Sequence, residues 1–399
     1  MEEKKSFFQG AIGKLLLPGI ILQSVLIGGG YATGREIVEY GAKFGDLGWL
    51  AGIATFIGFA VVSILSFELV RLCKVYDFKS FLKILIGPLY HVFDVVYLLF
   101  LVIIIAVMSA ATGSVVEEMT GLNHWYGIAA ITIIVGILNY YGEKIISYFE
   151  TIGTILLYLG YISFSILVIS NGGANIEQVF ATNDHSFVPD ATVTTALWTG
   201  ILYMAYNLVV FPASFFTVKN LKSRTDTVLA GILSGISMVI PWFLTYYSIL
   251  AFYPSKDVLA APVPWVTMMQ ANHAPAWLLV FFSIVLGWTL VATATGIIHA
   301  FLERIDTGLK DNGRKSLTRQ SRGILTLILL ILSVVLAQIG IIDLIAKGYN
   351  ALAYAFIAMY LIPLLTVGVY RICQVSRKKG QADSDGSFVN EYKAAVKSE

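Results

Sequence analysis

A run of residues without charge, from Leu15 to Gly34, contains three consecutive glycines toward its middle, Gly28 to Gly30. A helix of about 20 apolar residues crosses the hydrocarbon of a membrane. Glycine inside a helix costs roughly 1 kcal/mol relative to alanine, and an unpaired backbone group in hydrocarbon costs several more. We therefore predict a helix that is broken at residues 28–30 and lines a cavity there. Close packing of two helices is the alternative that the glycines leave open.

The composition indicates an all-α polytopic membrane protein. Hydrophobic residues make up 57% of the 399 residues and charged residues only 13%, against about 25% charged in soluble domains. A net charge of +2 gives no reason to expect a nucleic-acid partner. The sequence shows no paired acids at a site, no nucleotide-binding loop and no His/Cys cluster, so we expect no enzymatic activity and no cofactor.

Ten apolar runs are long enough to span a membrane. They cover residues 14–42 (interrupted at 28–30), 47–72, 89–117, 124–141, 145–170, 191–218, 226–252, 275–302, 323–340 and 346–373. We expect one transmembrane domain over residues 1–375, followed by a disordered cytoplasmic tail, residues 376–399, because the tail is charged and poor in apolar residues.

Basic residues orient these spans. If the N-terminus lies inside, all but four of the 27 Lys and Arg residues fall in cytoplasmic segments; the exceptions are Arg35, Lys43, Lys256 and Lys347. This bias places both termini in the cytoplasm.

The spans divide into two groups of five, residues 14–170 and 191–373, separated by a polar segment, residues 171–190, that we expect to be an external loop. Two copies of a unit with an odd number of spans lie in opposite orientations, so the second group is predicted to be an inverted repeat. The sixth span contains Asn207 and, five residues later, Pro212, which removes a helix amide. The first and sixth helices are therefore both predicted to be discontinuous.

This arrangement resembles the LeuT fold of the amino acid/polyamine/organocation (APC) superfamily, over residues 10–375. More narrowly, the motif from Gly28 to Glu36, followed by Tyr40-Gly41 and by Gly45-Asp46-Leu47-Gly48-Trp49, is similar to bacterial YkvI-type membrane proteins, a group classed with amino acid permeases. The resemblance implies a bacterial cell membrane and alternating access, in which spans one, two, six and seven rock against spans three, four, five and eight. It also implies that backbone amides of Gly28, Gly29 and Gly30 bind a substrate carboxylate.

The resemblance further implies a sodium site. Its ligands are the carbonyls of Ser24 and Ile27 and a hydroxyl of the eighth helix, for which Thr289 is the nearest match. Thr293 shares a face with Thr289, although threonines in membrane helices commonly bond their own backbone. Leu290 stands where sodium-coupled members carry a second hydroxyl, so Na⁺ and H⁺ both remain open as the coupling ion.

Other polar residues within the spans are candidates for the same site. Tyr203, Tyr206 and Asn207 lie at the predicted break of the sixth span, and Met108 lies in the third. Aromatic packing is the alternative for the tyrosines. Glu150 in the fifth span is a candidate for proton coupling, because an intramembrane acid is expensive unless it has a role; pairing with nearby Lys144 is the alternative.

Three charged residues follow the glycines, Arg35, Glu36 and Glu39. We expect them toward the outer surface, either as a gate or as a plain pair of Arg35 with Glu39. No acid is then expected at mid-membrane depth in spans one or six, which favours a zwitterionic substrate over a lone cation.

Together these features favour a secondary transporter, a cation-coupled symporter of amino acids or related small zwitterions. It would act in the lipid bilayer as a monomer or homodimer. Two alternatives stay open: a transporter-like sensor of the germinant-receptor type, and a divalent-metal transporter of the same fold.

Overall fold

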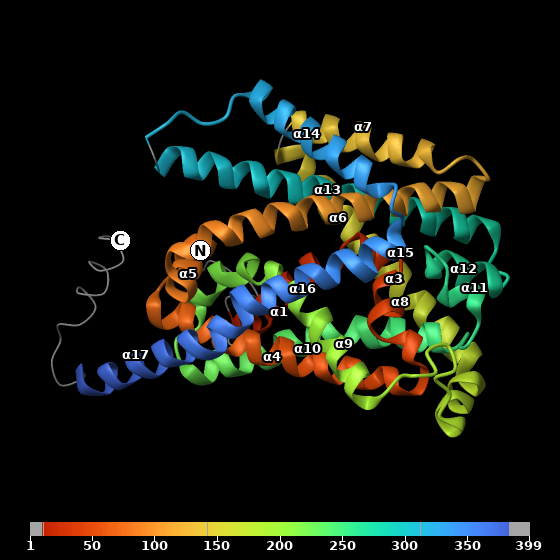
Figure 1. Cartoon of the computed structure of the whole chain (residues 1–399), viewed down its shortest axis with the longest axis horizontal. Coiled ribbons are helices and arrows are strands. Elements are labelled where there is room, and N and C mark those ends of the chain that lie inside the picture. The colour runs from red at the N-terminus through yellow and green to blue at the C-terminus, as the bar shows by residue number, and fades with distance from the viewer. Residues whose placement is uncertain (1–9, 11, 142, 312, 383–399) are drawn as a thin grey trace, which may run out of the picture.

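The computed structural model describes residue 10 and residues 12–382, apart from 142 and 312, and this part contains helices and no strands (Figure 1). The long elements are α1 (Gly13–Leu26), α4 (Gly48–Cys73), α6 (Tyr90–Thr120), α7 (Trp125–Tyr141), α8 (Glu143–Thr182), α9 (Val193–Tyr206), α10 (Arg224–Leu250), α13 (Ala276–Asp311), α14 (Arg319–Ala337) and α17 (Val369–Ala382). The shorter ones are α2 (Gly29–Ala32), α3 (Arg35–Tyr40), η2 (Ala42–Leu47), α5 (Phe78–Ile86), η3 (Gly87–Leu89), η4 (Asn207–Asn220), α11 (Lys256–Leu259), α12 (Pro264–Ala271), α15 (Ile341–Asp343), η5 (Leu344–Tyr349), α16 (Asn350–Phe356), η6 (Ile357–Leu361) and η7 (Leu364–Gly368).

Eight helical stretches of the described chain are long and apolar enough to cross a membrane. Two shorter apolar helices, Gly13–Leu26 and Trp125–Tyr140, lie at the first and fourth predicted spans. The prediction of an all-α, multi-pass membrane protein is therefore confirmed.

One predicted boundary is wrong, because α8 runs on to Thr182 through much of the segment expected to be a loop. Asn175 secures this extension by donating its side-chain amide to the carbonyls of Leu250 and Tyr253, at 3.1 and 2.9 Å. Partly buried Ile176 and buried Val179 pack against the core on the same stretch. Tertiary contacts thus continue a helix that its polar composition alone did not predict.

The helices form two packed groups. One consists of α1, α4, α9 and α10, which pack against one another, and the other of α6, α7, α13 and α14; α8 contacts both α10 and α13. In Figure 1 the first group occupies the lower half of the molecule and the second the upper half. Spans one, two, six and seven, which the family resemblance assigns to one moving unit, therefore pack as one group.

Both predicted helix interruptions are present, so the discontinuous first and sixth helices are confirmed. The first lies at Ile27 and Gly28, and Gly29 and Gly30 belong to the short helix α2, so the break is narrower than predicted. Helix α9 ends at Tyr206, and the chain continues from Asn207 as a 3₁₀ helix that contains Pro212. Tyr206, the last residue of α9, contacts Glu36 of α3, so side chains of the two interrupted helices meet.

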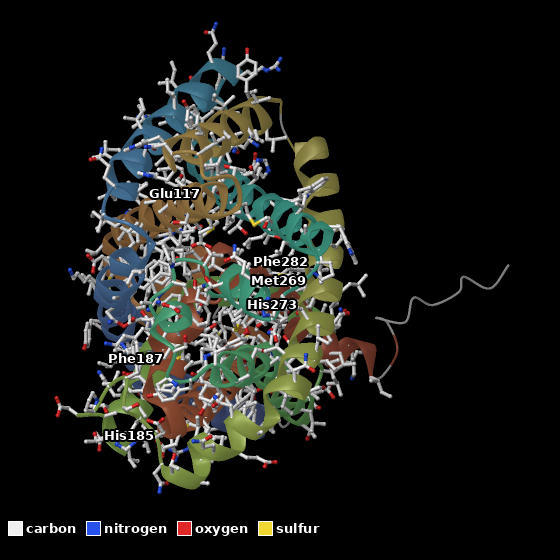
Figure 2. All side chains as sticks on the ribbon, turned by 90° about the vertical axis from the view of Figure 1, so that its right-hand side faces the viewer. Glu117, His185, Phe187, Met269, His273 and Phe282 are labelled. Atoms are coloured by element: carbon white, nitrogen blue, oxygen red, sulfur yellow. The ribbon has the colours of Figure 1, made fainter. Side chains whose placement is uncertain are left out.

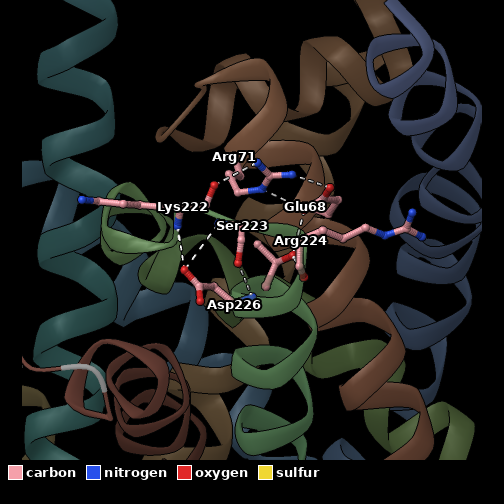
Figure 3. Close-up of polar contacts among 7 residues, drawn as sticks. Glu68, Arg71, Lys222, Ser223, Arg224 and Asp226 are labelled. Carbon is pink, nitrogen blue, oxygen red and sulfur yellow. Dashed lines mark hydrogen bonds and ion pairs between the residues drawn. The ribbon is translucent and has the colours of Figure 1, made fainter. Parts of the chain in front are cut away.

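A polar network joins the end of α4 to the start of α10 (Figure 3). The Glu68 carboxylate of α4 accepts hydrogen bonds from Arg71, at 2.6 and 2.9 Å, and from the hydroxyl of Thr227 of α10, at 2.8 Å. Asp226, also on α10, pairs with Lys14 of α1 at 2.9 Å. Three helices are thereby joined at one end, which favours their movement together.

Close helix contact within this group predicts a test of the packing. A Cβ atom on Gly200 of α9 would lie 2.2 Å from the Ala51 carbonyl oxygen of α4, a backbone atom with little freedom to move. We expect Gly200→Ala to lower the melting temperature in detergent. The matched control is Gly287→Ala on α13, where a Cβ meets nothing within 4 Å. The control gains helix propensity, so its melting temperature is expected to stay or rise; equal behaviour of the two variants would contradict this packing.

Candidate functional site

A sharp turn after α2 positions the residues that follow the glycines. Gly34 adopts φ +82°, a left-handed conformation that favours glycine, and a Cβ there would lie 2.9 Å from the Trp265 ring. The Thr33 hydroxyl donates to the Gly30 carbonyl at 2.7 Å and accepts from the Arg35 amide at 3.2 Å. This turn starts α3 in a direction that carries Glu36 back over α2.

Glu36 is the acidic residue of the site. Its side chain is buried, and its carboxylate accepts a hydrogen bond of 2.5 Å from the hydroxyl of Tyr206 at the end of α9. A Cβ on Gly30 would lie only 2.1 Å from the other carboxylate oxygen of Glu36, so only glycine leaves room for this acid. The sequence predicted no acid at mid-membrane depth in spans one or six and placed Glu36 toward the outer surface; the structure instead places its carboxylate against Gly30 at the interrupted helix. The turn at Gly34 is the reason, since a continuous helix would have carried Glu36 away from the glycines.

Six buried tyrosines surround this contact and form what we call the tyrosine cluster: Tyr31, Tyr40, Tyr161, Tyr203, Tyr206 and Tyr349. They come from α2, α3, α8, α9 and η5. Tyr206 lies at the centre, with ring centroids 5.4 Å from Tyr40, 5.4 Å from Tyr203 and 4.7 Å from Tyr349. The interface of the two interrupted helices is thus aromatic and rich in hydroxyl groups.

Several polar atoms in and beside the cluster make no hydrogen bond of normal geometry within the described part of the chain. They are the hydroxyls of Tyr31 and Tyr203 and both amide atoms of Gln23, which is 7% exposed near the end of α1. Native proteins leave few buried polar groups unpaired, and those that remain call for an explanation such as a ligand. Polar side chains lie close to these atoms: Tyr161 and Thr245 near Tyr31, Tyr206 near Tyr203, and Tyr158 near Gln23. A shift of these neighbours, a water molecule or a polar ligand would satisfy them.

The structure places the predicted substrate residues on several elements around α2 and α9. Tyr203 and Tyr206 belong to the cluster, and Asn207 beside them is buried and donates its side-chain amide to the Tyr203 carbonyl at 2.9 Å. Gly28 faces α13, where a Cβ would lie 3.2 Å from the Thr293 methyl group. Met108 is buried on α6, which packs against α2.

The predicted ligands of the sodium ion are less clearly directed toward one point than the predicted substrate residues are. Ser24 is exposed and donates its hydroxyl to Ile21 at 2.8 Å, whereas Ile27 is buried. The Thr289 hydroxyl donates to the Val285 carbonyl one turn earlier, at 2.9 Å, as the alternative for membrane threonines anticipates. The sodium site stays a prediction.

Two further predictions concern proton coupling through Glu150 and the binding of a divalent metal ion. Glu150 lies within α8, but its side chain falls outside the described residues. Over the part of the chain that the structure describes, no group of three or more His, Cys, Asp or Glu residues is placed to hold a metal ion.

Arg35 connects the site to the end of the bundle that carries α11 and α12. We call this end the outer end. Its guanidinium donates to the carbonyls of Leu259 and Ala261, at 2.6 and 3.2 Å, and lies 3.6 Å from Glu39. Figure 2 looks onto this end, with Met269 of α12, His273 just after it and Phe282 of α13 close to one another. Arg35 therefore pairs with Glu39, as the simpler alternative predicts, and also contacts the residues after α11; the gate stays a prediction.

Glu36, Gln23 and four tyrosines of the cluster, Tyr31, Tyr40, Tyr161 and Tyr349, were not predicted as site residues. A usable signal for Glu36 was present in the sequence, because an acid within an apolar run is expensive unless it faces the protein interior. The tyrosines gave no comparable signal, since aromatic residues are common throughout the chain.

Comparison with known proteins supports the fold. No protein-family model matches the chain. It is 24% identical over 348 residues to the uncharacterized protein YyaD of Bacillus subtilis (strain 168), covering 87% of this chain and 94% of that protein.

Two solved structures have a similar fold at low sequence identity. One is a mutant of the manganese transporter of Eremococcus coleocola, with a TM-score of 0.59, 13% identity, and coverage of 92% of this chain and 81% of that one. The other is the substrate-bound, outward-open state of a Na⁺-coupled sialic acid symporter, with a TM-score of 0.50, 15% identity, and coverage of 92% and 87%. The chain has this LeuT-like fold.

The contacts of Arg35 predict how the outer end is held. Arg35→Ala removes the two hydrogen bonds to the carbonyls at residues 259 and 261, so amide hydrogens of residues 256–271 are expected to exchange faster with deuterium. The control is Lys43→Ala, which breaks the ion pair of Lys43 with Glu39 without touching α11 or α12. If both variants exchange like the wild type, Arg35 does not hold this segment.

Proposed function

We propose that this protein is a secondary transporter of amino acids or related small zwitterionic solutes, driven by a coupling cation. The observation that carries the proposal is the set of unpartnered polar atoms of Gln23, Tyr31 and Tyr203 beside the interrupted helices. In transporters with inverted repeats, substrate sites lie where discontinuous helices meet near the middle of the membrane. The fold shared with a manganese transporter and a sialic acid symporter supports the same class of function.

The chemistry of the unpartnered atoms suits a zwitterion. The Gln23 side chain offers a donor and an acceptor, and each tyrosine hydroxyl offers both. Rings of the tyrosine cluster attract an ammonium group, a contact worth about 0.5 to 2 kcal/mol depending on burial. We place the substrate carboxylate near Gly28, Gly29 and Gly30, as the family resemblance implies, and its ammonium group toward the rings of Tyr203 and Tyr206.

Alternating access requires two bodies that move against each other. The group of α1, α4, α9 and α10 and the group of α6, α7, α13 and α14 supply them, and α2, which carries Gly29 and Gly30, contacts α6 and α13 of the second group. We propose that the protein works in a bacterial cell membrane with both termini in the cytoplasm, in agreement with the distribution of its basic residues.

A screen for ligands followed by exchange across a membrane tests this function. Purified protein is first screened by thermal shift against amino acids, amines and Mn²⁺, and a stabilising compound is then tested for counterflow in proteoliposomes. We expect an amino acid to bind and exchange, and its amide and its decarboxylated amine to bind at least about tenfold more weakly, or 1.4 kcal/mol. Binding without counterflow would identify a sensor, and stabilisation by Mn²⁺ alone would identify a metal site; either result contradicts the proposal.

Removing the hydroxyl of Tyr203 tests whether this group contacts the ligand or stabilises the fold. Tyr203→Phe deletes an unpartnered hydroxyl, so we expect several-fold weaker amino acid binding and an unchanged or higher melting temperature of the ligand-free protein. The control is Tyr246→Phe, whose buried hydroxyl donates to the Gly45 carbonyl at 2.8 Å. This control is expected to lose about 1 kcal/mol of stability and to keep its affinity. Loss of stability with unchanged affinity in Tyr203→Phe would remove Tyr203 from the binding site.

A further inference from the structure

Glu36 stands at the contact between the two interrupted helices. Its carboxylate touches the Tyr206 hydroxyl of α9 on one side and the backbone of Gly30 on the other. The residue is 6% exposed, so water has little access to it in this conformation. Any movement that separates α3 from α9 breaks the hydrogen bond with Tyr206 and opens the carboxylate to its surroundings.

The two cationic side chains nearest to Glu36 in the sequence are bonded to other groups. Arg35 donates to the carbonyls of Leu259 and Ala261 and pairs with Glu39. Lys43 of η2 also pairs with Glu39. Neither cation is hydrogen-bonded to Glu36.

The other elements packed against α3 are α2, α9, α10 and η5, together with the rest of η2. Their titratable side chains near Glu36 are the tyrosines Tyr31, Tyr203, Tyr206 and Tyr349, with Tyr40 on α3 itself. Tyr246 of α10 donates to Gly45, Asp46 of η2 is bonded to His185, and Lys347 of η5 is exposed and pairs with Asp343. Among the residues described, no ion pair joins Glu36 to a cation.

A carboxylate that is removed from water without a cation beside it is expensive to keep charged. A proton neutralises it within one covalent bond and needs no additional space. The Tyr206 hydroxyl can still donate to the neutral acid, and the new O–H group can donate to a neighbouring oxygen. The packing around Glu36, with hydroxyls and rings close on every side, is suited to this smallest of cations.

We propose that Glu36 binds the coupling proton of the transport cycle. The inference rests on the proposed function, because coupling presupposes transport. In the closed conformation Glu36 carries the proton, and movement of the two groups of helices against each other lets water reach the acid and take the proton up or away. A substrate that brings its own carboxylate to Gly30 strengthens the requirement, since two adjacent carboxylates in a buried site do not both stay charged.

Infrared spectroscopy tests the proton site without any substrate. The C=O stretch of a protonated carboxyl group is recorded for the full-length protein in lipid nanodiscs from acidic to alkaline pH, and variant spectra are subtracted from that of the wild type. We expect Glu36→Gln to remove one carboxyl band that the wild type shows at neutral pH. Glu39→Gln is the matched control on the same half-helix, because Glu39 is ion-paired and contributes no such band.

A second variant keeps the test decisive if Glu36→Gln fails to fold. Tyr206→Phe removes the hydrogen bond to Glu36, so the same band is expected to remain and to shift in frequency. A wild type without the band at neutral pH, or a band that survives in Glu36→Gln, overturns the proposal. Loss of the wild-type band on addition of methylammonium chloride, but not of potassium chloride, also overturns it, because Glu36 would then be the counter-ion of an organic cation.

Transport assays then separate coupling from transport itself. In proteoliposomes, the wild type is expected to accumulate the amino acid found in the screen when a pH gradient is imposed, and Glu36→Gln is expected to lose this accumulation. Full accumulation by Glu36→Gln contradicts the proton site while leaving the proposed function intact. Absence of exchange in the wild type contradicts the proposed function, whereas the infrared result stands independently of it.

Discussion

The hydrogen bond between Tyr206 and Glu36 links the two interrupted helices, and several features of the local structure position its donor and its acceptor. Gly34 takes a left-handed conformation that turns α3 back over α2, and Gly30 leaves the space that the carboxylate fills. Helix α9 ends at Tyr206 itself, so that its last residue presents a hydroxyl to the acid. A change at any of these positions alters how the acid is held between the two interrupted helices.

Polar groups that lack partners give this interface its chemical character. Hydrophobic packing alone accounts for the tyrosine rings, which contact one another at ordinary distances. It does not account for the hydroxyls of Tyr31 and Tyr203 or for the amide of Gln23, which are buried at a cost that a folded protein normally avoids. Under the proposed function, a bound solute with donors and acceptors of its own would satisfy such groups.

Much of the fold was predictable because the membrane imposes strong rules on sequence. Long apolar runs, the glycines at residues 28–30 and the pair Asn207 and Pro212 indicated the spans and both interruptions, since unsatisfied backbone is so costly in hydrocarbon. The extension of α8 to Thr182 was missed, because contacts of Asn175 with residues distant in sequence stabilise it. The place of Glu36 was missed for a related reason: it depends on the left-handed turn at Gly34, whereas helical periodicity predicts the direction of a side chain only while the helix continues.

A structure determined by cryo-electron microscopy with a transported amino acid bound tests the central claim most directly. The account predicts density for the solute between α2 and α9, within hydrogen-bonding distance of the hydroxyls of Tyr31 and Tyr203, with Glu36 beside it. A solute bound elsewhere, with the contact of Tyr206 and Glu36 unchanged and the polar atoms of Gln23, Tyr31 and Tyr203 still unpaired, would contradict it.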